Sequence, residues 1–174
     1  MFRDEEQVKE HLLSLDFDLQ SKNLKDKVCF VIFGGTAFLF FSQTFRGTSD
    51  IDAYFLNRVV DDEIIQIMNG YDVNNQLQGI AGIPEEFRDR AYELKGFNNL
   101  QVYIAHPIDL IVSKLLRAER RDVVDVLDSG IMDHVENLDE LRTIYNETRD
   151  NQMGHPLRFV DIDQIIDEYI ERKK

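Results

Sequence analysis

Several scarcities in this sequence exclude whole classes of protein. The chain has a single cysteine, Cys29, so it cannot form an internal disulfide, and we expect that residue to be a small buried hydrophobe in a reducing compartment. No apolar run approaches the roughly 20 residues that a membrane-spanning helix needs. The acidic first six residues lack the apolar core of a secretion signal. We therefore expect a cytoplasmic protein with no membrane partner.

Basic residues are also scarce. Twenty Lys and Arg residues stand against 33 Asp and Glu residues, which gives a formal net charge of −13. Sequence-independent binding to nucleic acid needs a basic face. The composition therefore argues against an extended nucleic-acid footprint, although it leaves room for a local phosphate or metal site.

The hydrophobic pattern predicts a small α+β domain. With 174 residues, of which 43% are hydrophobic, the chain is long enough for one core. We predict strands over residues 28–33, 51–56 and 100–104, in a sheet of three or four strands. We predict helices over residues 5–15, 36–43, 61–69, 107–117, 122–127, 138–148 and 160–172, with a short helix from Pro84, a loop over 74–83 and a turn at 154–156.

The sequence does not mark a sharp domain boundary, because no clear linker divides the chain. We take residues 1–136 as the main domain and residues 137–174 as a C-terminal helical extension, which can equally be part of the same domain.

Two aspartates at the start of the second predicted strand point to a metal site. Asp50 and Asp52 are two residues apart, so their carboxylates lie on the same face of a strand. Two like charges this close repel each other unless a cation lies between them. Hard divalent cations with oxygen ligands, above all Mg²⁺ or the similar Mn²⁺, resolve this conflict. The alternative is a solvated surface pair in an acidic chain.

A glycine pair ends the first predicted strand and opens a helix. Gly34 and Gly35 let the backbone approach a ligand closely, Thr36 adds a hydroxyl, and a helix N-terminus presents free N–H groups to an anion. On its own a glycine pair after a strand is usually only a tight turn. Together with the two aspartates it predicts a phosphate-holding turn beside a metal-holding acid pair, as a nucleoside triphosphate requires.

These residues resemble the signature of the nucleotidyltransferase superfamily related to DNA polymerase β. Its long form, Gly-Gly-Thr-Ala at 34–37 with Arg-x-Thr-x-Asp-Ile-Asp at 46–52, resembles the bacterial minimal nucleotidyltransferases and the abortive-infection, toxin–antitoxin-associated branch. A second block, residues 100–110 followed by Lys114 and Arg-Asp-x-x-Asp at 121–125, is similar to that branch as well. The resemblance covers roughly residues 28–130.

The resemblance implies a mixed polymerase-β-like sheet with flanking helices, and an enzyme that transfers an NMP group from an NTP to an acceptor. It implies that Mg²⁺ or Mn²⁺ is the cofactor and that the acceptor is an RNA end, a protein hydroxyl or a small molecule. A toxin–antitoxin role with an antitoxin protein as partner is part of the same expectation. The implied site residues are Asp50 and Asp52 for the metal, Gly34, Gly35, Thr36 and Arg46 for the nucleotide, Lys114 for substrate or phosphate, and Asp122 and Asp125 as supports.

One departure from the superfamily pattern leaves a second function open. Many members carry a third carboxylate on a later strand, but the strand predicted over 100–104 contains no Asp or Glu. The nearest earlier acids are Asp72, Asp89 and Glu93, and the sequence does not choose among them. A non-catalytic module that binds a nucleotide or a partner on the same fold is therefore the alternative.

The basic residues near the second block also have two interpretations. Lys114 and Asp125 are 11 residues apart, so they share a face if one helix runs through both. Lys114, Arg117, Arg120 and Arg121 form the densest basic cluster, which is either a charge-balancing helix face or a docking patch for an RNA end or an acidic partner. Arg46 is either a phosphate contact or a loop arginine paired with surface acids.

Overall fold

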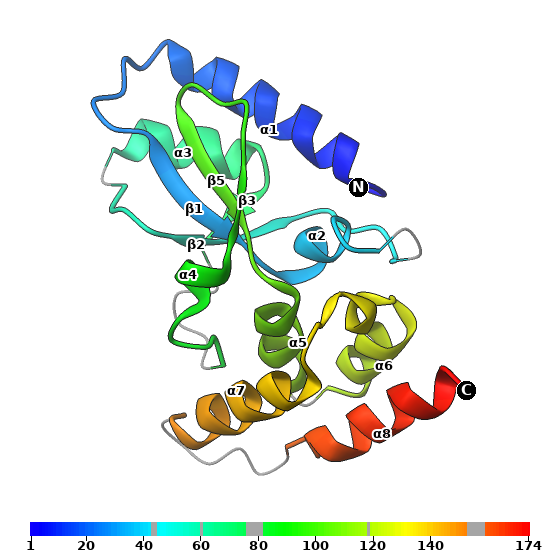
Figure 1. The fold of residues 1–174 in the computed structure, drawn as a ribbon. Helices are drawn as coiled ribbons and strands as arrows, with labels where there is room; N and C mark the ends of the chain where they lie inside the picture. The colour runs from blue at the N-terminus through cyan, green and yellow to red at the C-terminus, as the bar shows by residue number, and fades with distance from the viewer. Residues whose placement is uncertain (43–44, 60, 76–81, 118, 153–158) are drawn as a thin grey trace.

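A mixed five-stranded sheet lies at the centre of the fold (Figure 1). The computed structural model of the chain describes residues 1–42, 45–59, 61–75, 82–117, 119–152 and 159–174. The strand order is β3-β2-β1-β5-β4, with β1 antiparallel to β2 and parallel to β5. The α+β class and the mixed sheet predicted from the sequence are confirmed.

The three predicted strands are present as β1 (Val28–Ile32), β2 (Ile51–Phe55) and β5 (Leu100–Ile104). Two strands were not predicted, β3 (Val73–Asn74), which pairs in parallel with β2, and β4 (Tyr92–Leu94), which pairs antiparallel with β5. The expected count of three or four strands is therefore wrong. With two and three residues, β3 and β4 are too short to show a hydrophobic period.

The two faces of the sheet differ in burial. Strand β5 alternates between buried and half-buried positions, and the partners of its buried residues on β1, such as Phe30 and Ile32, are also buried. The buried stripes of α1 (Glu5–Gln20) and α3 (Asp62–Gly70), which lie side by side, belong to the same core as this face (Figure 1). On the opposite face, which we call the open face, Asp52, Tyr54 and Tyr103 are only half-buried.

A buried carboxylate fixes α1 to the sheet. Asp16 is 5% exposed and accepts the backbone N–H groups of Asn98, Asn99 and Leu100 at 2.7–3.0 Å. It therefore satisfies the donors at the start of β5, which would otherwise be left without partners.

Helix starts follow the sequence signals closely. Side chains cap α1, α3, α7 (Leu138–Asp150) and α8 (Ile162–Arg172), and His106 caps α5 (Pro107–Leu115), where Pro107 takes the first turn. The cap residues of the first four helices are Asp4, Asp61, Asn137 and Asp161. Each cap satisfies a backbone donor that the first helical turn leaves free.

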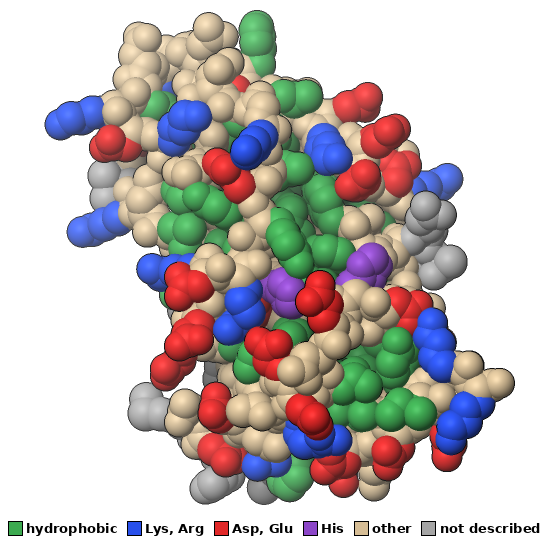
Figure 2. Space-filling view, in the orientation of Figure 1, with side chains coloured by type: hydrophobic (Ala, Val, Ile, Leu, Met, Phe, Trp, Pro, Cys, Tyr) green, Lys and Arg blue, Asp and Glu red, His purple; other side chains and the backbone are tan. Residues whose placement is uncertain are grey.

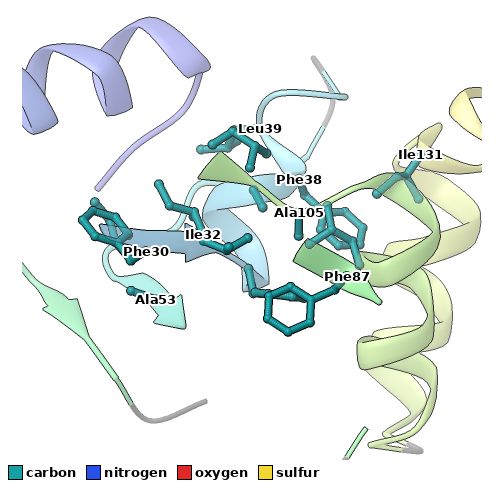
Figure 3. Packing of buried hydrophobic residues seen from close by; sticks show 14 of the residues in the cluster. Phe30, Ile32, Phe38, Leu39, Ala53, Phe87, Ala105 and Ile131 are labelled. Atoms are coloured by element: carbon teal, nitrogen blue, oxygen red, sulfur yellow. The ribbon is translucent and has the colours of Figure 1, made fainter. Parts of the chain in front are cut away.

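The helices after β5 pack on the end of the sheet that carries α2 (Gly34–Phe38). Helix α5 contacts α2, α6 (Arg120–Asp128), α7 and the 3₁₀ turn η2 (Ile131–His134), while α8 contacts α6 and α7. Figure 3 shows side chains from β1, β2, α2, η2 and α4 (Phe87–Arg90) converging in one core. A buried ion pair between Arg90 and Asp109, at 2.7 Å, joins α4 to α5.

The predicted helices are broadly present, with shifted ends. The helix expected over 5–15 continues to Gln20, and the one expected over 36–43 is α2, which begins at Gly34. The expected turn at Gly154 and most of the expected loop over 74–83 lie outside the described residues. None of the described helices combines the length and apolarity needed to cross a membrane.

Candidate functional site

The glycine pair at the end of β1 lies against the start of β2, the strand that carries Asp52. The Phe33 N–H group donates to the Asp52 carbonyl oxygen at 2.8 Å, which continues the pairing of β1 with β2. Gly34 follows with φ +60°, and a Cβ atom there would lie 2.1 Å from Asp52 Oδ2. The Asp52 carboxylate therefore lies directly against the backbone of Gly34, and this arrangement requires a glycine.

Gly35 and Thr36 continue this close packing. A Cβ atom on Gly35 would lie 3.3 Å from the Thr48 side chain, which is tighter than most packed contacts. Thr36 is 1% exposed, and its hydroxyl donates to the Asp50 carbonyl oxygen at 2.5 Å. Thr36 thus holds the start of β2 against α2, and its predicted contact with a triphosphate stays a prediction.

The two aspartates differ in environment. Asp50 is exposed, and its carboxylate accepts the Thr48 hydroxyl at 3.1 Å. Asp52 is half-buried; burial, and then the charge of Asp50, raises the pKa of its carboxyl, against a hydrogen bond from Asn74 and the positive charges of Arg117 and Lys114. The two carboxylates repel each other, and a divalent cation bound to their oxygens would relieve this repulsion.

Asn74 is a site residue that the sequence analysis missed. It lies opposite Asp52 in the register of β2 and β3, and its side chain hydrogen-bonds the Asp52 carboxylate. The only sequence signal was an apolar residue between two polar ones at 72–74, too short to indicate a strand. Asn74 adds a third oxygen-bearing side chain beside the acid pair.

No third acid joins the pair within the described part of the chain. There, no three His, Cys, Asp or Glu side chains are grouped so that they could hold a metal ion. None of Asp72, Asp89 and Glu93 therefore completes a three-acid site with Asp50 and Asp52. Two carboxylates and the neighbouring amide fit a hard cation by their donor chemistry, with fewer charged ligands than a three-acid set provides.

A second cluster centres on the buried amine of Lys114. Lys114 is 3% exposed, and its Nζ atom lies 3.1 Å from Asp122 Oδ1 and 2.6 Å from Asp125 Oδ2. The same amine lies over the rings of Phe38 and Phe45. The two predicted supporting acids therefore contact Lys114, but the amine is enclosed by protein, and its predicted contact with substrate stays a prediction.

The condition under which Lys114 and Asp125 would share one helix face is not met. Helix α5 ends at Leu115 and α6 begins at Arg120, so no continuous helix runs through both residues. They meet because α6 packs back against α5. The two separate helices predicted over 107–117 and 122–127 are confirmed, although no proline or glycine lies between α5 and α6.

Two arginines complete the cluster. Arg46 bonds Asp125 at 3.2 and 3.4 Å, and Arg117 bonds Asp122 at 3.0 Å; each side chain remains 40% or more exposed. Burial alone would raise the pKa of the Asp125 carboxyl, but hydrogen bonds from Arg46 and Lys114 outweigh it and hold that pKa below its usual value. Asp122 Oδ2 is buried without a hydrogen-bond partner, unlike other buried side-chain polar atoms of the described residues.

This cluster lies one side chain away from the glycine pair. Phe45, which lies beneath the Lys114 amine, would be 3.4 Å from a Cβ atom on Gly35. The exposed Arg46 and Arg117 side chains thus border the Gly34–Asp52 contact on the side of α5 and α6. Over the face of the molecule in Figure 2, the described basic side chains are interspersed with acidic ones.

Comparison with known proteins agrees with this geometry. No curated protein and no solved structure matches the chain. A family model described as "Nucleotidyltransferase of unknown function (DUF6036)" matches residues 10–174, which is nearly the whole chain. The resemblance to the nucleotidyltransferase superfamily is thereby confirmed, while the toxin-associated branch stays a prediction. The chain belongs to this family of nucleotidyltransferases.

Proposed function

We propose that the protein is a metal-dependent nucleotidyltransferase that moves an NMP group from an NTP to an acceptor hydroxyl. The observation that carries this proposal is the contact between Gly34 and Asp52. A Cβ atom on Gly34 would lie 2.1 Å from the Asp52 carboxylate, so the glycine-lined turn and the acid pair form one site. The family membership supports the same reaction class.

Asp50 and Asp52 would hold Mg²⁺ or Mn²⁺ in this site, with the Asn74 amide beside them. When bound, the metal supplies charge stabilisation and a lowered pKa for the attacking hydroxyl. The glycine backbone at 34–35 gives the triphosphate close access, and Arg46 and Arg117 offer exposed guanidinium groups to its charge.

The chemical step balances as a displacement at phosphorus. The acceptor oxygen forms a bond to the α-phosphorus while the bond from that phosphorus to the oxygen bridging to the β-phosphate breaks. The hydroxyl proton goes to solvent, and pyrophosphate leaves with the bonding electrons. The chain's contribution is to place the acceptor in line with the leaving group, which can supply much of the rate enhancement.

The test is label transfer from each α-labelled NTP in the presence of Mg²⁺ and cell extract. We expect the wild-type chain to label an acceptor, and the Asp50→Ala and Asp52→Ala variants to fail. Asp62→Asn removes a comparable charge from an exposed position on α3 and should label normally. Absence of label with the wild-type chain, for every NTP, would refute the proposed transfer.

One observation favours a second candidate, a nucleotide-binding module without catalysis. The described residues provide two carboxylates rather than three for a metal. The missing carboxylate weakens binding of the ion that activates the acceptor more than binding of the ion that accompanies the NTP. Isothermal calorimetry separates the two candidates. Binding of an NTP with Mg²⁺ but no label transfer would support the module and contradict the enzyme.

A toxin role and an antitoxin partner belong to the same proposal, since the resemblance to the toxin-associated branch implies them. Induced expression of the wild-type chain should then arrest growth, whereas Asp50→Ala should not. Equal growth with both proteins would refute the toxin role and leave the transferase activity to be judged by the label assay.

A further inference from the structure

The open face of the sheet carries the Asp52 side chain of β2. Asp52 and Tyr54 are two residues apart, so both side chains lie on this face. Tyr54 is level with Val31 of β1 and, beyond it, with Tyr103 of β5. Tyr54 and Tyr103 are both half-buried, so solvent reaches this face beside the acid pair.

Helix α4 packs on this face next to Asp52. Its Phe87 ring lies 5.5 Å from Phe33 and 4.9 Å from Tyr54, measured between ring centroids. Phe33 is the strand neighbour of Asp52 through its backbone N–H group, and Tyr54 follows Asp52 on the same strand. Figure 3 shows Phe87 among the buried side chains near the end of β1.

Arg88, the residue after Phe87, is held on two aromatic rings. Its guanidinium carbon lies 5.7 Å from the Tyr54 centroid and 5.7 Å from the Phe87 centroid, and the residue is exposed. Within the described part of the chain, Arg88 makes no ion pair or hydrogen bond. Its charge nevertheless reaches the open face, because it lowers the pKa of the Cys29 thiol against the dominant effect of burial, which raises it.

Among the described arginines, Arg46, Arg90 and Arg117 bond to carboxylates. Those that make no ion pair with a described acid are Arg3, Arg58, Arg88, Arg120 and Arg121, and of these Arg88 is the one that lies over aromatic rings. A guanidinium that stacks on rings keeps its N–H edges free for an oxyanion, and the rings limit the motion that binding would have to freeze. Arg88 is therefore a prepared anion contact on the open face, over Tyr54, two residues after Asp52 on β2.

The position of Arg88 assigns it to the acceptor rather than to the NTP. The glycine turn is bordered by Arg46 and Arg117, which the proposed function assigns to the triphosphate. Arg88 lies in the other direction from Asp52, over Tyr54, which is about 7 Å further along the strand. An anion bound there shares the open face with Asp52 and lies further along β2 than the triphosphate cradle.

We propose that Arg88 binds a phosphate of the acceptor, so that the acceptor is a phosphorylated molecule of the nucleotide class, either a nucleotide or an oligonucleotide end. This inference rests on the proposed function, since it names the acceptor of the same site. One cation suits a single terminal phosphate, and the acidic surface opposes a longer nucleic-acid contact. The half-buried Tyr103 ring on the same face offers a stacking surface for a base.

The test measures binding to the full chain without NTP, so that it does not depend on turnover. A fluorescently labelled short single-stranded oligoribonucleotide is titrated by anisotropy at several salt concentrations. For Arg88→Ala we expect affinity roughly five- to tenfold weaker and a log–log salt slope smaller by about 0.7, the value for one phosphate contact with a single strand. Arg88→Lys should keep most of the slope.

A matched control removes the same charge elsewhere. Lys95 is exposed and lies after β4, at the end of the sheet opposite Asp52. Lys95→Ala should bind the probe like the wild-type chain. In competition, AMP should displace the probe better than adenosine for the wild-type chain, and the two should become similar for Arg88→Ala.

Three outcomes would overturn the inference. They are an unchanged affinity and slope for Arg88→Ala, an equal loss for Lys95→Ala, and equal competition by AMP and adenosine with the wild-type chain. Thermal unfolding of each variant checks that the fold persists, and a destabilised Arg88→Ala is replaced by Arg88→Gln. Because no transfer is measured, failure here leaves the transferase proposal intact, whereas failure of the label assay leaves the measured phosphate contact intact.

Discussion

Replacement of Gly34 by alanine tests the central contact of the site. The change introduces two separate costs. Gly34 has φ +60°, and an L-residue with a side chain loses about 1–2 kcal/mol in this left-handed region. The new Cβ atom would also lie 2.1 Å from Asp52 Oδ2 and 3.0 Å from Asp52 Cγ, so the carboxylate must move by about 1 Å to relieve the overlap.

The displacement should affect function more than stability. A carboxylate can rotate or shift at modest cost, so we expect the free energy of unfolding to fall by about 2 kcal/mol. A misplacement of about 1 Å in a reacting site can lower the rate on the order of 100-fold. We therefore expect weaker Mn²⁺ binding by electron paramagnetic resonance and a loss of label transfer of about that size.

Gly130→Ala is the matched control. Gly130 has φ +81°, and a Cβ atom there would meet nothing within 4 Å. It carries the backbone cost without the clash, so urea unfolding should show a loss of about 1–2 kcal/mol with Mn²⁺ affinity and transfer unchanged.

A double-mutant cycle isolates the contact itself. In an Asp52→Ala background the overlapping oxygen is gone, so Gly34→Ala should cost little more than its backbone strain. The reasoning is refuted if Gly34→Ala binds Mn²⁺ as tightly as the wild-type chain, or if its effect on stability is the same with and without the Asp52 carboxylate.

Three further predictions concern the scaffold of the site, each measured by chemical unfolding. Lys114→Met should lower the free energy of unfolding by about 3–5 kcal/mol, because it leaves two buried carboxylates of α6 without their amine. Lys173→Met, at an exposed ion pair, should leave the free energy of unfolding almost unchanged, and equal losses for the two variants would contradict the buried-pair argument. Asp16→Ala should lower the free energy of unfolding by about 3 kcal/mol, because three backbone N–H groups at the start of β5 lose their acceptor. Asp18→Ala, at an exposed position, is the control. A similar small loss of stability for both variants would refute the expectation. Burial lowers the pKa of His106 below its usual 6.5, so the unfolded chain takes up the proton first and stability present above pH 6.5 is lost as pH falls below it. His106→Asn keeps a capping side chain, and its free energy of unfolding should depend less on pH. The same pH dependence of unfolding for the variant and the wild-type chain would contradict this.

The sequence predicted the parts of the site that are encoded locally. The apolar run of β1 ended by two glycines, and the two acids entering β2, both stand within short segments, and period-2 and glycine signals are sufficient to place them. The helix starts predicted at residues 61 and 138 likewise lie within one residue of the starts of α3 and α7.

The missed residues depend on pairings between distant segments. Asn74 reaches Asp52 only because a two-residue strand adds to the edge of β2, and such a short segment carries no period of its own. Lys114 and Asp125 were predicted as site residues and as parts of two separate helices, but the sequence did not show that these helices pack so that the two side chains meet. In both cases tertiary contacts decide the geometry, and local propensity is silent.

Arg88 shows why the acceptor side of such a site is harder to predict than the nucleotide side. In the sequence it is one of several charges in a short segment after Pro84, and its neighbours Glu86 and Asp89 make a surface ion pair the obvious expectation. In the structure the guanidinium group instead lies over Tyr54 and Phe87 and makes no ion pair with either acid, while Glu86 pairs with Arg90. Metal and triphosphate contacts need a fixed geometry and therefore leave a compact motif, whereas an acceptor phosphate needs only one held cation at the right place on the sheet. The chain can supply that cation from any element that packs on the open face, so only the fold identifies it.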